Sequence, residues 1–418
     1  MADSIPLSNV FSVPNNFQIN EVVDPTLKRP TRAAPSQNLG PLVVFVGTWT
    51  GRGFNTIFRP DNMQTPTPFV PPIASDNVLE LNLTEETLSF SNNLGSIPNR
   101  GSGKQGDIFL NAVPYLQTIN DVTTAPATGI HFEPGMWLRV PATTHPSEPE
   151  TIARMASIPH GATIVAQGIL LSMVHGKPTI DPIDITPFRG GNPQAKVRLP
   201  SQTATNRTTP RIPQDLANFI AAGTITQAIL DDPNTVIRNQ IRNQHISETL
   251  VIGISTNPAS PLFGGPLPAA SPTTQPPPLV PSFGGGPSNI AFLLGVPNPP
   301  PTALGPNAQT LQMDAVFWIE TVIYRVAVPV MPAGSPPLIL QPVQTPPPVL
   351  LQPSFLASIP FEPGKGFAGG IVAIATTQIQ YSQKVILNFD GLSWPHVSVA
   401  SLVPAEPIPI PADLLPLT

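Results

Sequence analysis

Alternating apolar and polar positions recur along the chain and predict β-strands. The clearest case runs from Leu79 to Leu83, where the two classes alternate strictly, and Leu88 and Phe90 resume the period in shifted phase after a pair of glutamates. Such alternation is typical of a strand with one buried face. The segment is therefore predicted to be one half-buried strand, or two strands joined by a tight turn.

Other segments combine β-branched and aromatic residues and end at Pro, Gly or Asn, which also predicts strands. The first runs from Leu42 through Trp49, and Gly47, Gly51 and Gly53 mark places where it can bend or approach another backbone. The remaining predicted strands are residues 108–119, 130–140, 151–157, 163–174, 249–254, 290–294, 315–328, 371–380, 384–389 and 397–403.

The pattern changes between Pro210 and His245. Apolar residues after Asp215 are spaced by three and four, and residues 226–230 and 236–241 follow with helical character. This predicts two or three short helices. Residues 258–286, 296–307 and 329–353 are rich in proline and predict loops, because proline removes a backbone donor. Stiff surface connectors are the favoured interpretation, and polyproline ligands for partner domains are the alternative.

Composition narrows the classes of function. Charged residues are 11 % of the 418, and 20 Lys and Arg against 25 Asp and Glu give a net charge of −5, so no basic nucleic-acid footprint is expected. The absence of cysteine excludes disulfides and thiolate metal sites. Without a signal-like N-terminus or an apolar stretch of roughly 18 to 20 residues, we expect a soluble cytoplasmic protein with no membrane span.

An internal echo suggests a duplication. Phe132-Glu-Pro-Gly recurs at Phe361, and each copy is followed by Ala-Thr-Thr and later by Pro-His, at Pro159 and Pro395. The spacings differ, so coincidence is the alternative. The predicted organisation is an N-terminal arm (1–40), a β-barrel unit (41–200), a helical insertion (201–246), a second β unit (247–404) and a C-terminal tail (405–418). Two barrels and one larger closed sheet are both allowed.

The run Gly47-Thr-Trp-Thr-Gly-Arg-Gly resembles the Gly-x-Trp opening of the calycin barrels, most closely the form found in nitrobindin-like proteins. These are small antiparallel barrels that resemble fatty-acid-binding proteins and hold haem. The resemblance implies that Trp49 packs across the closed end of a barrel and that Gly51 and Gly53 let the strand coil. It also implies an iron-binding histidine late in the barrel, where His396 is the nearest match in position.

Three of the six histidines are candidate site residues. His160 and His396 each follow proline at the start of a predicted strand, where a stiff backbone could aim the ring into a haem pocket. His131 and Glu133 are two residues apart and would share one strand face, so they could act as an acid–base pair. A surface or structural role, or a rim hydrogen bond, is the alternative in each case.

Two polar residues could anchor a ligand. Arg139 alternates in phase with Trp137, and in calycin-like pockets an inward arginine often holds a carboxylate; stacking on the outside of Trp137 is the alternative. Gln167 lies in a largely apolar run, so its amide is expected either to make a cross-strand bond or to line a cavity.

We therefore expect a mainly β protein with a calycin-like antiparallel barrel, a second β unit, a short helical insertion and long Pro-rich loops. The favoured function is binding of an apolar or amphipathic small molecule, with haem the leading candidate. The candidate residues for such a site are His396, the proposed metal ligand, with His160, Gln167, Arg139 and Trp49. The alternatives are a peroxidase-like enzyme using His131 and Glu133 in the same cavity, and a structural protein that assembles through its Pro-rich loops. A homo-oligomer is left open.

Overall fold

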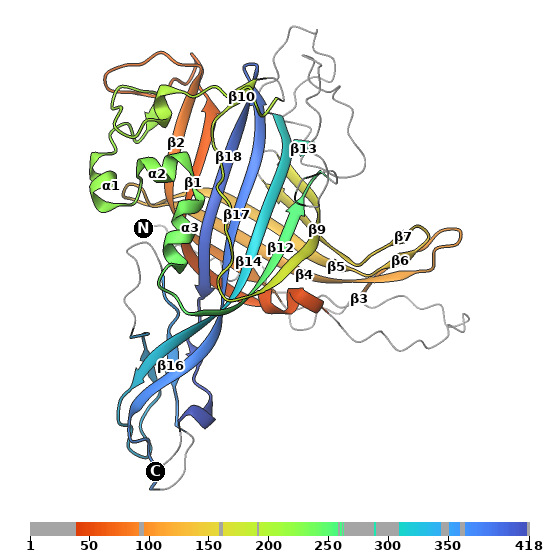
Figure 1. Cartoon of the computed structure of the whole chain (residues 1–418), viewed down its shortest axis with the longest axis vertical. Coiled ribbons are helices and arrows are strands. Elements are labelled where there is room, and N and C mark those ends of the chain that lie inside the picture. Colours follow the sequence, from red (N-terminus) through yellow and green to blue (C-terminus); the bar gives the residue numbers. More distant parts are fainter. Residues whose placement is uncertain are drawn as a thin grey trace, which may run out of the picture. The chain divides into compact units, whose positions relative to one another are not determined.

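The computed structural model describes residues 39–91, 96–158, 162–189, 192–257, 260, 262, 288–289, 309–343, 351–359 and 364–415. It shows a mainly β protein, as the strand patterns predict (Figure 1). Ten long antiparallel strands pair side by side, and β2 pairs with β4 to close the sheet into a barrel. Because the sheet closes, every barrel strand has a hydrogen-bonded neighbour on both sides.

The barrel strands come from both halves of the chain. In order around the wall they are β2 (Asn77–Phe90), β1 (Gly47–Pro60), β18 (Leu392–Pro404), β17 (Gly370–Phe389), β14 (Gln309–Val328), β12 (Ile246–Ser255), β9 (Ala162–His175), β8 (Thr151–Ile158), β5 (Thr128–Val140) and β4 (Ile108–Asp121). Both predicted units thus contribute strands to one closed sheet. This is one of the two arrangements that the sequence allowed, the other being two separate barrels. The strand predicted at residues 290–294 lies outside the described residues.

The prediction that a strand begins at Leu42 is wrong. Gly40–Phe45 forms a 3₁₀ helix, η2, with Pro41 in its first turn, and β1 begins at Gly47. Leu42 and Phe45 are three residues apart, so both lie on one side of this helix, where they are fully buried among interior residues of the barrel. The same two side chains would face opposite sides of a strand.

The shifted phase in β2 marks two different packing partners. Leu79 and Leu81 belong to a buried cluster outside the barrel, whereas Leu88 and Phe90 belong to the interior cluster. The outer cluster includes residues of the three short helices predicted from the sequence: α1 (Ala217–Ala222), α2 (Gln227–Asp231) and α3 (Asn234–Ile241). They cover the outer face of β1, β2 and β18 (Figure 1). β2 is accordingly one continuous strand that buries apolar side chains on both of its faces.

Two glycines let β1 lie close to β18. A Cβ on Gly51 would stand 2.0 Å from the backbone oxygen of Ser401, and one on Gly53 would stand 2.1 Å from that of Val399. The strands could not keep this register with any larger residue. The structure thus agrees with the expectation that these glycines permit close approach.

Beyond the barrel, β14 and β17 continue as a two-stranded ribbon, which we call the extension. Their pairing runs on to Val328 and Gly370, past the last barrel partners on either side. A small sheet of β15 (Leu338–Leu340), β16 (Phe355–Ala357) and β19 (Ile408–Pro409) accompanies it. Phe355 is fully buried there and its ring lies 5.9 Å from that of Tyr324. The predicted C-terminal tail is partly built into the fold, because β19 pairs with β16, and Ile410 and Leu415 are buried in the same cluster as Phe355.

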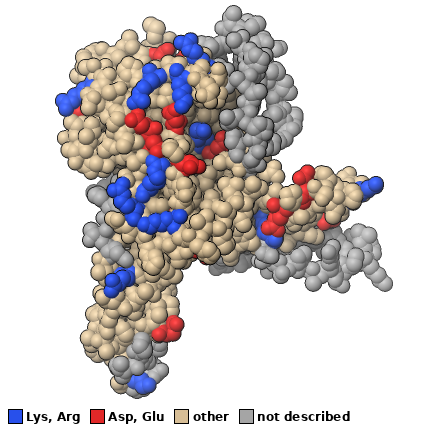
Figure 2. All heavy atoms as spheres, viewed as in Figure 1, with Lys and Arg blue, Asp and Glu red and all other residues tan. Residues whose placement is uncertain are grey.

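Short elements complete the described fold. They are β3 (Ser96–Asn99), β6 (Thr143–Thr144), β7 (Ser147–Glu148), β10 (Phe188–Arg189), η3 (Pro200–Gln202), β11 (Arg211–Ile212), β13 (Ser288–Asn289) and η6 (Ala412–Leu414). Figure 2 shows charged side chains of both signs close together on one face, and wide areas without any charge. This sparse distribution is what a charged fraction of 11 % leads one to expect.

Candidate functional site

A cavity of about 530 Å³ lies inside the barrel. Its volume falls in the range of small-molecule sites, roughly 300–1,000 Å³. The upper walls are largely aliphatic, because inward positions of the strands carry residues such as Ile57, Ile119, Ile158, Ile164 and Leu387. The residues that fill the barrel toward η2 are mainly aromatic and aliphatic. The cavity therefore has apolar walls above a packed closed end.

Between these two zones lies a layer of polar side chains, which we call the polar floor. Register places it midway along the inward faces: on β4, Tyr115 and Gln117 follow Val113 and precede Ile119. The members of the polar floor come from five strands and are Glu86, Tyr115, Gln117, Glu133, Arg154, Tyr381 and Gln383.

The centre of the floor is a buried ion pair. Nη2 of Arg154 donates to Oε1 of Glu133 at 2.5 Å, and the two side chains are 3 % and 0 % exposed. Nε of Arg154 donates to the hydroxyl of Tyr115 at 2.9 Å, and Nη1 donates to Oε1 of Gln383 at 2.8 Å. The guanidinium also lies within 6 Å of the rings of Tyr115, Trp137 and Phe317. Such pairing is what makes a charge tolerable inside a barrel.

The electrostatics of the pair are mutually supporting. Burial raises the pKa of Glu133, but the positive charge of Arg154 and hydrogen bonds from His131 and Tyr115 outweigh it, so the pKa lies well below its ordinary value. Burial lowers the pKa of Arg154, but the negative charge of Glu133 outweighs this effect and raises that pKa above its usual value. Both groups are therefore ionised at neutral pH.

A second carboxyl group joins the floor through hydrogen bonds only. Oε2 of Glu86 accepts from the hydroxyl of Tyr381 at 2.6 Å and from Nε2 of Gln117 at 3.3 Å, and Oε1 accepts from Thr84 at 3.0 Å. Burial raises the pKa of Glu86 despite these bonds. None of its described partners is a cation, and in this it differs sharply from Glu133.

Two histidines line the cavity above the floor. Nε2 of His131 lies 3.1 Å from Oε2 of Glu133, so the structure brings together the predicted acid–base pair. Nε2 of His396 lies 2.8 Å from Nδ2 of Asn55, which also donates to Ser398 at 2.7 Å. Each imidazole is thus oriented by a neighbouring side chain. Within the described residues no cluster of three or more His, Asp and Glu side chains is arranged to bind a metal ion.

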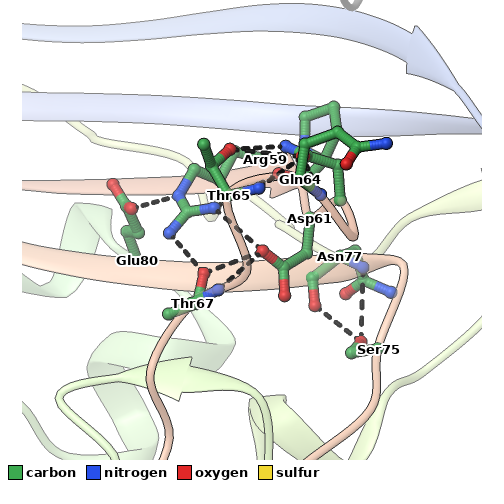
Figure 3. A network of polar contacts seen from close by, with 10 residues as sticks. Arg59, Asp61, Gln64, Thr65, Thr67, Ser75, Asn77 and Glu80 are labelled. Atoms are coloured by element: carbon green, nitrogen blue, oxygen red, sulfur yellow. Dashed lines mark hydrogen bonds and ion pairs between the residues drawn. The ribbon is translucent and has the colours of Figure 1, made fainter.

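At the mouth of the cavity, Arg59 holds a network of polar groups (Figure 3). Its guanidinium bonds Glu80 across the β1–β2 pair and donates to the hydroxyl of Thr67 at 2.8 Å. Oδ1 of Asp61 accepts from the backbone and the hydroxyl of Thr67. The loop between β1 and β2 is thereby tied to the rim, and Arg59 is paired with a carboxylate, as Arg154 is.

Three further predicted site residues, Arg139, Gln167 and Trp49, do not face the cavity. Arg139 shares the inward phase of Trp137, as predicted, but it lies at the closed end, bonds Glu150 and approaches Gly40. Gln167 is exposed on the outer face of β9. Trp49 is 5 % exposed in the interior cluster, and its Nε1 donates to the backbone oxygen of Phe45 at 2.7 Å. His160 lies outside the described residues.

Sequence reasoning missed most of the polar floor. Arg154 alternates with Ile152, Ala156 and Ile158, so its inward position follows from the strand pattern once the inward face is known. The sequence offers no way to choose that face, because Met155 and its neighbours are apolar as well. Arg154 therefore occupies the inward arginine position that the sequence analysis gave to Arg139.

Comparisons with protein-family models, with curated proteins and with solved structures found no match to this chain. Among the described residues, no helix is long and apolar enough to cross a bilayer.

Proposed function

We propose that the protein binds an apolar or amphipathic small molecule inside the barrel. The observation that carries this proposal is the cavity of about 530 Å³, whose apolar walls end on a hydrogen-bonded polar floor. A ligand there would gain roughly 25 cal/mol for each Å² of apolar surface removed from water, before the cost of association. The polar floor would fix its orientation, as a few polar groups do in most small-molecule pockets.

Filling the cavity is the direct test. Ile164 faces the cavity from β9 and is 3 % exposed, whereas the next residue, Val165, faces outward and is 40 % exposed. We expect Ile164→Trp to weaken binding of the neutral fluorescent probe Nile red at least about tenfold, because the indole would occupy the ligand volume. Val165→Trp is the matched control and should bind the probe as the original protein does. Equal binding by both variants would place the probe elsewhere and reject the proposal.

Haem is the first specific candidate. The Gly47–Gly53 motif, which resembles that of nitrobindin-like proteins, and the two cavity histidines support it. A metal-bound histidine usually donates its second ring nitrogen to a carboxylate or carbonyl, and Glu133 stands in that position beside His131. His396, the ligand suggested by sequence position, is instead held by the amide of Asn55. His131 therefore fits an axial ligand role and joins His396 as a candidate, although iron binding by His396 would require the amide of Asn55 to release Nε2.

A bound haem would supply an iron able to bind small diatomic ligands. Haem titration followed by absorption spectroscopy tests this version. We expect a Soret band in the original protein that is lost in either His131→Ala or His396→Ala, with His245→Ala as a control outside the cavity. Absence of a band in the original protein would reject haem and leave binding of other ligands to the Nile red test.

A peroxidase-like activity in the same cavity is a second candidate, favoured by the contact between His131 and Glu133. The carboxylate would hold the imidazole in one orientation while its ring nitrogen moves a proton. Peroxide-dependent oxidation of a dye by haem-loaded protein, abolished in Glu133→Gln and retained in Glu148→Gln, would support it.

Assembly is a third candidate, favoured by an apolar area on the outer wall. Met155, Val165, Leu170, Leu171 and Met173 are all more than a third exposed on β8 and β9. Exposed apolar patches of this kind often mark interaction sites. Light scattering after size exclusion would separate an oligomer, whose mass falls in Met173→Glu, from a monomer unaffected by that change.

A further inference from the structure

The polar floor contains an arginine in the place where a ligand carboxylate would be expected to bind. Arg154 faces the cavity and is almost fully buried, and a planar guanidinium in such a position is well suited to a carboxylate. Whether the floor accepts a charged or a neutral ligand group therefore depends on whether this arginine is already neutralised by the protein.

Arg154 is neutralised by the protein itself. Glu133 faces it from the adjacent strand β5, bonds it at 2.5 Å and is fully buried. Both oxygens of Glu133 are engaged, Oε1 by Arg154 and Tyr115 and Oε2 by His131. A ligand carboxylate at the floor would bring a second carboxylate to a single arginine in an almost fully buried site. Such a charge is both desolvated and repelled, which selects against it.

The floor still offers neutral hydrogen-bonding groups. Oε1 of Gln383 accepts from Arg154, while its Nε2 has no protein partner among the described residues. Nε2 of Gln117 donates to Glu86 and Tyr381, while its Oε1 likewise has no partner there. Both glutamines line the cavity. One amide donor and one amide acceptor therefore face the space that a ligand would enter.

The mouth provides no lysine and no unpaired arginine among the described lining residues. Arg59 is the other arginine that lines the cavity, and Glu80 and Asp61 neutralise it (Figure 3). A ligand that carries an anionic group would have to keep that group at the mouth, in contact with water. The propionate groups of haem would be under the same restriction.

We propose that the polar floor receives an uncharged hydrogen-bonding group, such as an amide or an alcohol, and that Glu133 sets this preference by neutralising Arg154. The inference rests on the proposed function, because it concerns the part of a bound amphiphile that reaches the floor. It makes Glu133 a specificity-determining residue for the chemical class of the ligand.

A matched ligand series tests the preference. Decanamide, decanol and decanoate share one tail, and each is used at neutral pH to displace Nile red from the full chain. We expect the amide and the alcohol to displace the probe at concentrations at least about tenfold below that of decanoate. If Nile red does not bind at all, the proposed function fails. If it binds and decanoate competes as well as the amide, this inference fails while the proposed function stands.

Glu133→Gln supplies the decisive comparison, because it keeps the shape of the side chain and removes the negative charge. Arg154 would then be available to a carboxylate, so the preference should reverse in favour of decanoate. The ratio of the two affinities should change by about a hundredfold, and differences in water solubility cancel because both proteins meet the same compounds. Glu148→Gln, which removes an exposed acid from β7, should leave the ratio unchanged. An unchanged ratio in folded Glu133→Gln would overturn the inference.

Gln383→Met provides a second route should the Glu133 variant fail to fold. It removes the amide donor at the floor, together with the oxygen that accepts from Nη1 of Arg154, and leaves the Arg154–Glu133 pair in place. Decanamide affinity should fall about fivefold while decanoate affinity does not fall, because only the neutral ligand uses that donor and the substitution frees Nη1 of Arg154. Equal losses for both ligands would contradict the assignment of the floor.

Discussion

Glu320 is a buried carboxyl group that pairs with no cation in the described part of the chain. It is 1 % exposed on β14, its Oε2 accepts from Gln378 at 2.6 Å, and its Oε1 has no hydrogen-bond partner among the described residues. Burial raises its pKa from 4.5 to about 8, although the bond from Gln378 acts in the opposite direction. The group therefore stays protonated in the folded protein at a pH where it ionises in the unfolded chain.

This difference predicts a loss of stability with rising pH. Below pH 4.5 both states are protonated and the contribution is fully present; between pH 4.5 and about 8 only the unfolded state releases the proton, so the free energy of unfolding falls. We expect Glu320→Gln to match the original protein near the lower limit and to exceed it by a few kcal/mol near the upper limit. Urea unfolding of both proteins between pH 4.5 and about 8 measures this difference in the free energy of unfolding.

The control for this prediction is Glu406→Gln, which removes an exposed acid and should reproduce the pH dependence of the original protein. Parallel pH curves for Glu320→Gln and the original protein would show that Glu320 is ionised in the folded state.

The sequence predicted which side chains of one strand share a face, but not which side chains meet across the barrel. His131 and Glu133 are two positions apart on β5, so their shared face was predictable, and they lie 3.1 Å apart. The contact of Glu133 with Arg154 depends on the register between β5 and β8, which no local pattern encodes. The same limit applies to Arg139 and Arg154: both alternate with apolar residues along their strands, and only their positions along the barrel distinguish them.

At the element scale, η2 and the start of β1 form the closed end of the barrel. The indole of Trp49 donates to the backbone oxygen of Phe45, and the ring of Phe45 lies 5.1 Å from that of Trp137. The helix is thus held by one hydrogen bond and by aromatic packing. Trp49 does not line the cavity, in keeping with the structural role that the family resemblance implies.

Trp49→Phe should therefore lower stability without changing ligand binding. It keeps an aromatic ring but removes the donor, which leaves a buried carbonyl oxygen unpaired at a cost of about 1–3 kcal/mol. Thermal unfolding measures the loss, and Nile red titration of the folded variant should match the original protein. A matching loss of probe affinity would mean that the closed end shapes the cavity.

Local periodicity predicted most barrel strands and the helices of residues 217–241, because each buries one face. It failed at residues 42–45, where the apolar run fits a strand as well as a helix. There the helix forms because it covers the closed end of the barrel. It also misjudged the length of β17, a single strand from Gly370 to Phe389 that was predicted as two. Polar residues of β17 such as Gln380 and Gln383 bond side chains of other elements, and so they interrupt the apolar pattern without ending the strand.

At the scale of the whole molecule, the barrel is continuous across the two halves that the internal echo suggested. β1 pairs with β18, and β9 pairs with β12, so each half supplies neighbours to the other at two separate seams. The repeated sequence elements could not reveal this, since a duplication is compatible with two barrels as well as with one. The pairing of strands distant in sequence decided the outcome.

The two seams predict that neither half folds alone. A fragment of residues 37–200 would leave β1 without β18 and β9 without β12, and the interior apolar side chains of this open sheet would be exposed to water. We expect no cooperative thermal transition by circular dichroism for this fragment or for residues 201–418. Co-expression should restore one transition, because the seams reform between the fragments. A sharp transition in the isolated first fragment would show instead that its strands form a closed sheet by themselves. That result would contradict the cavity described above, because its wall includes Met313, Tyr381 and His396 from the second half.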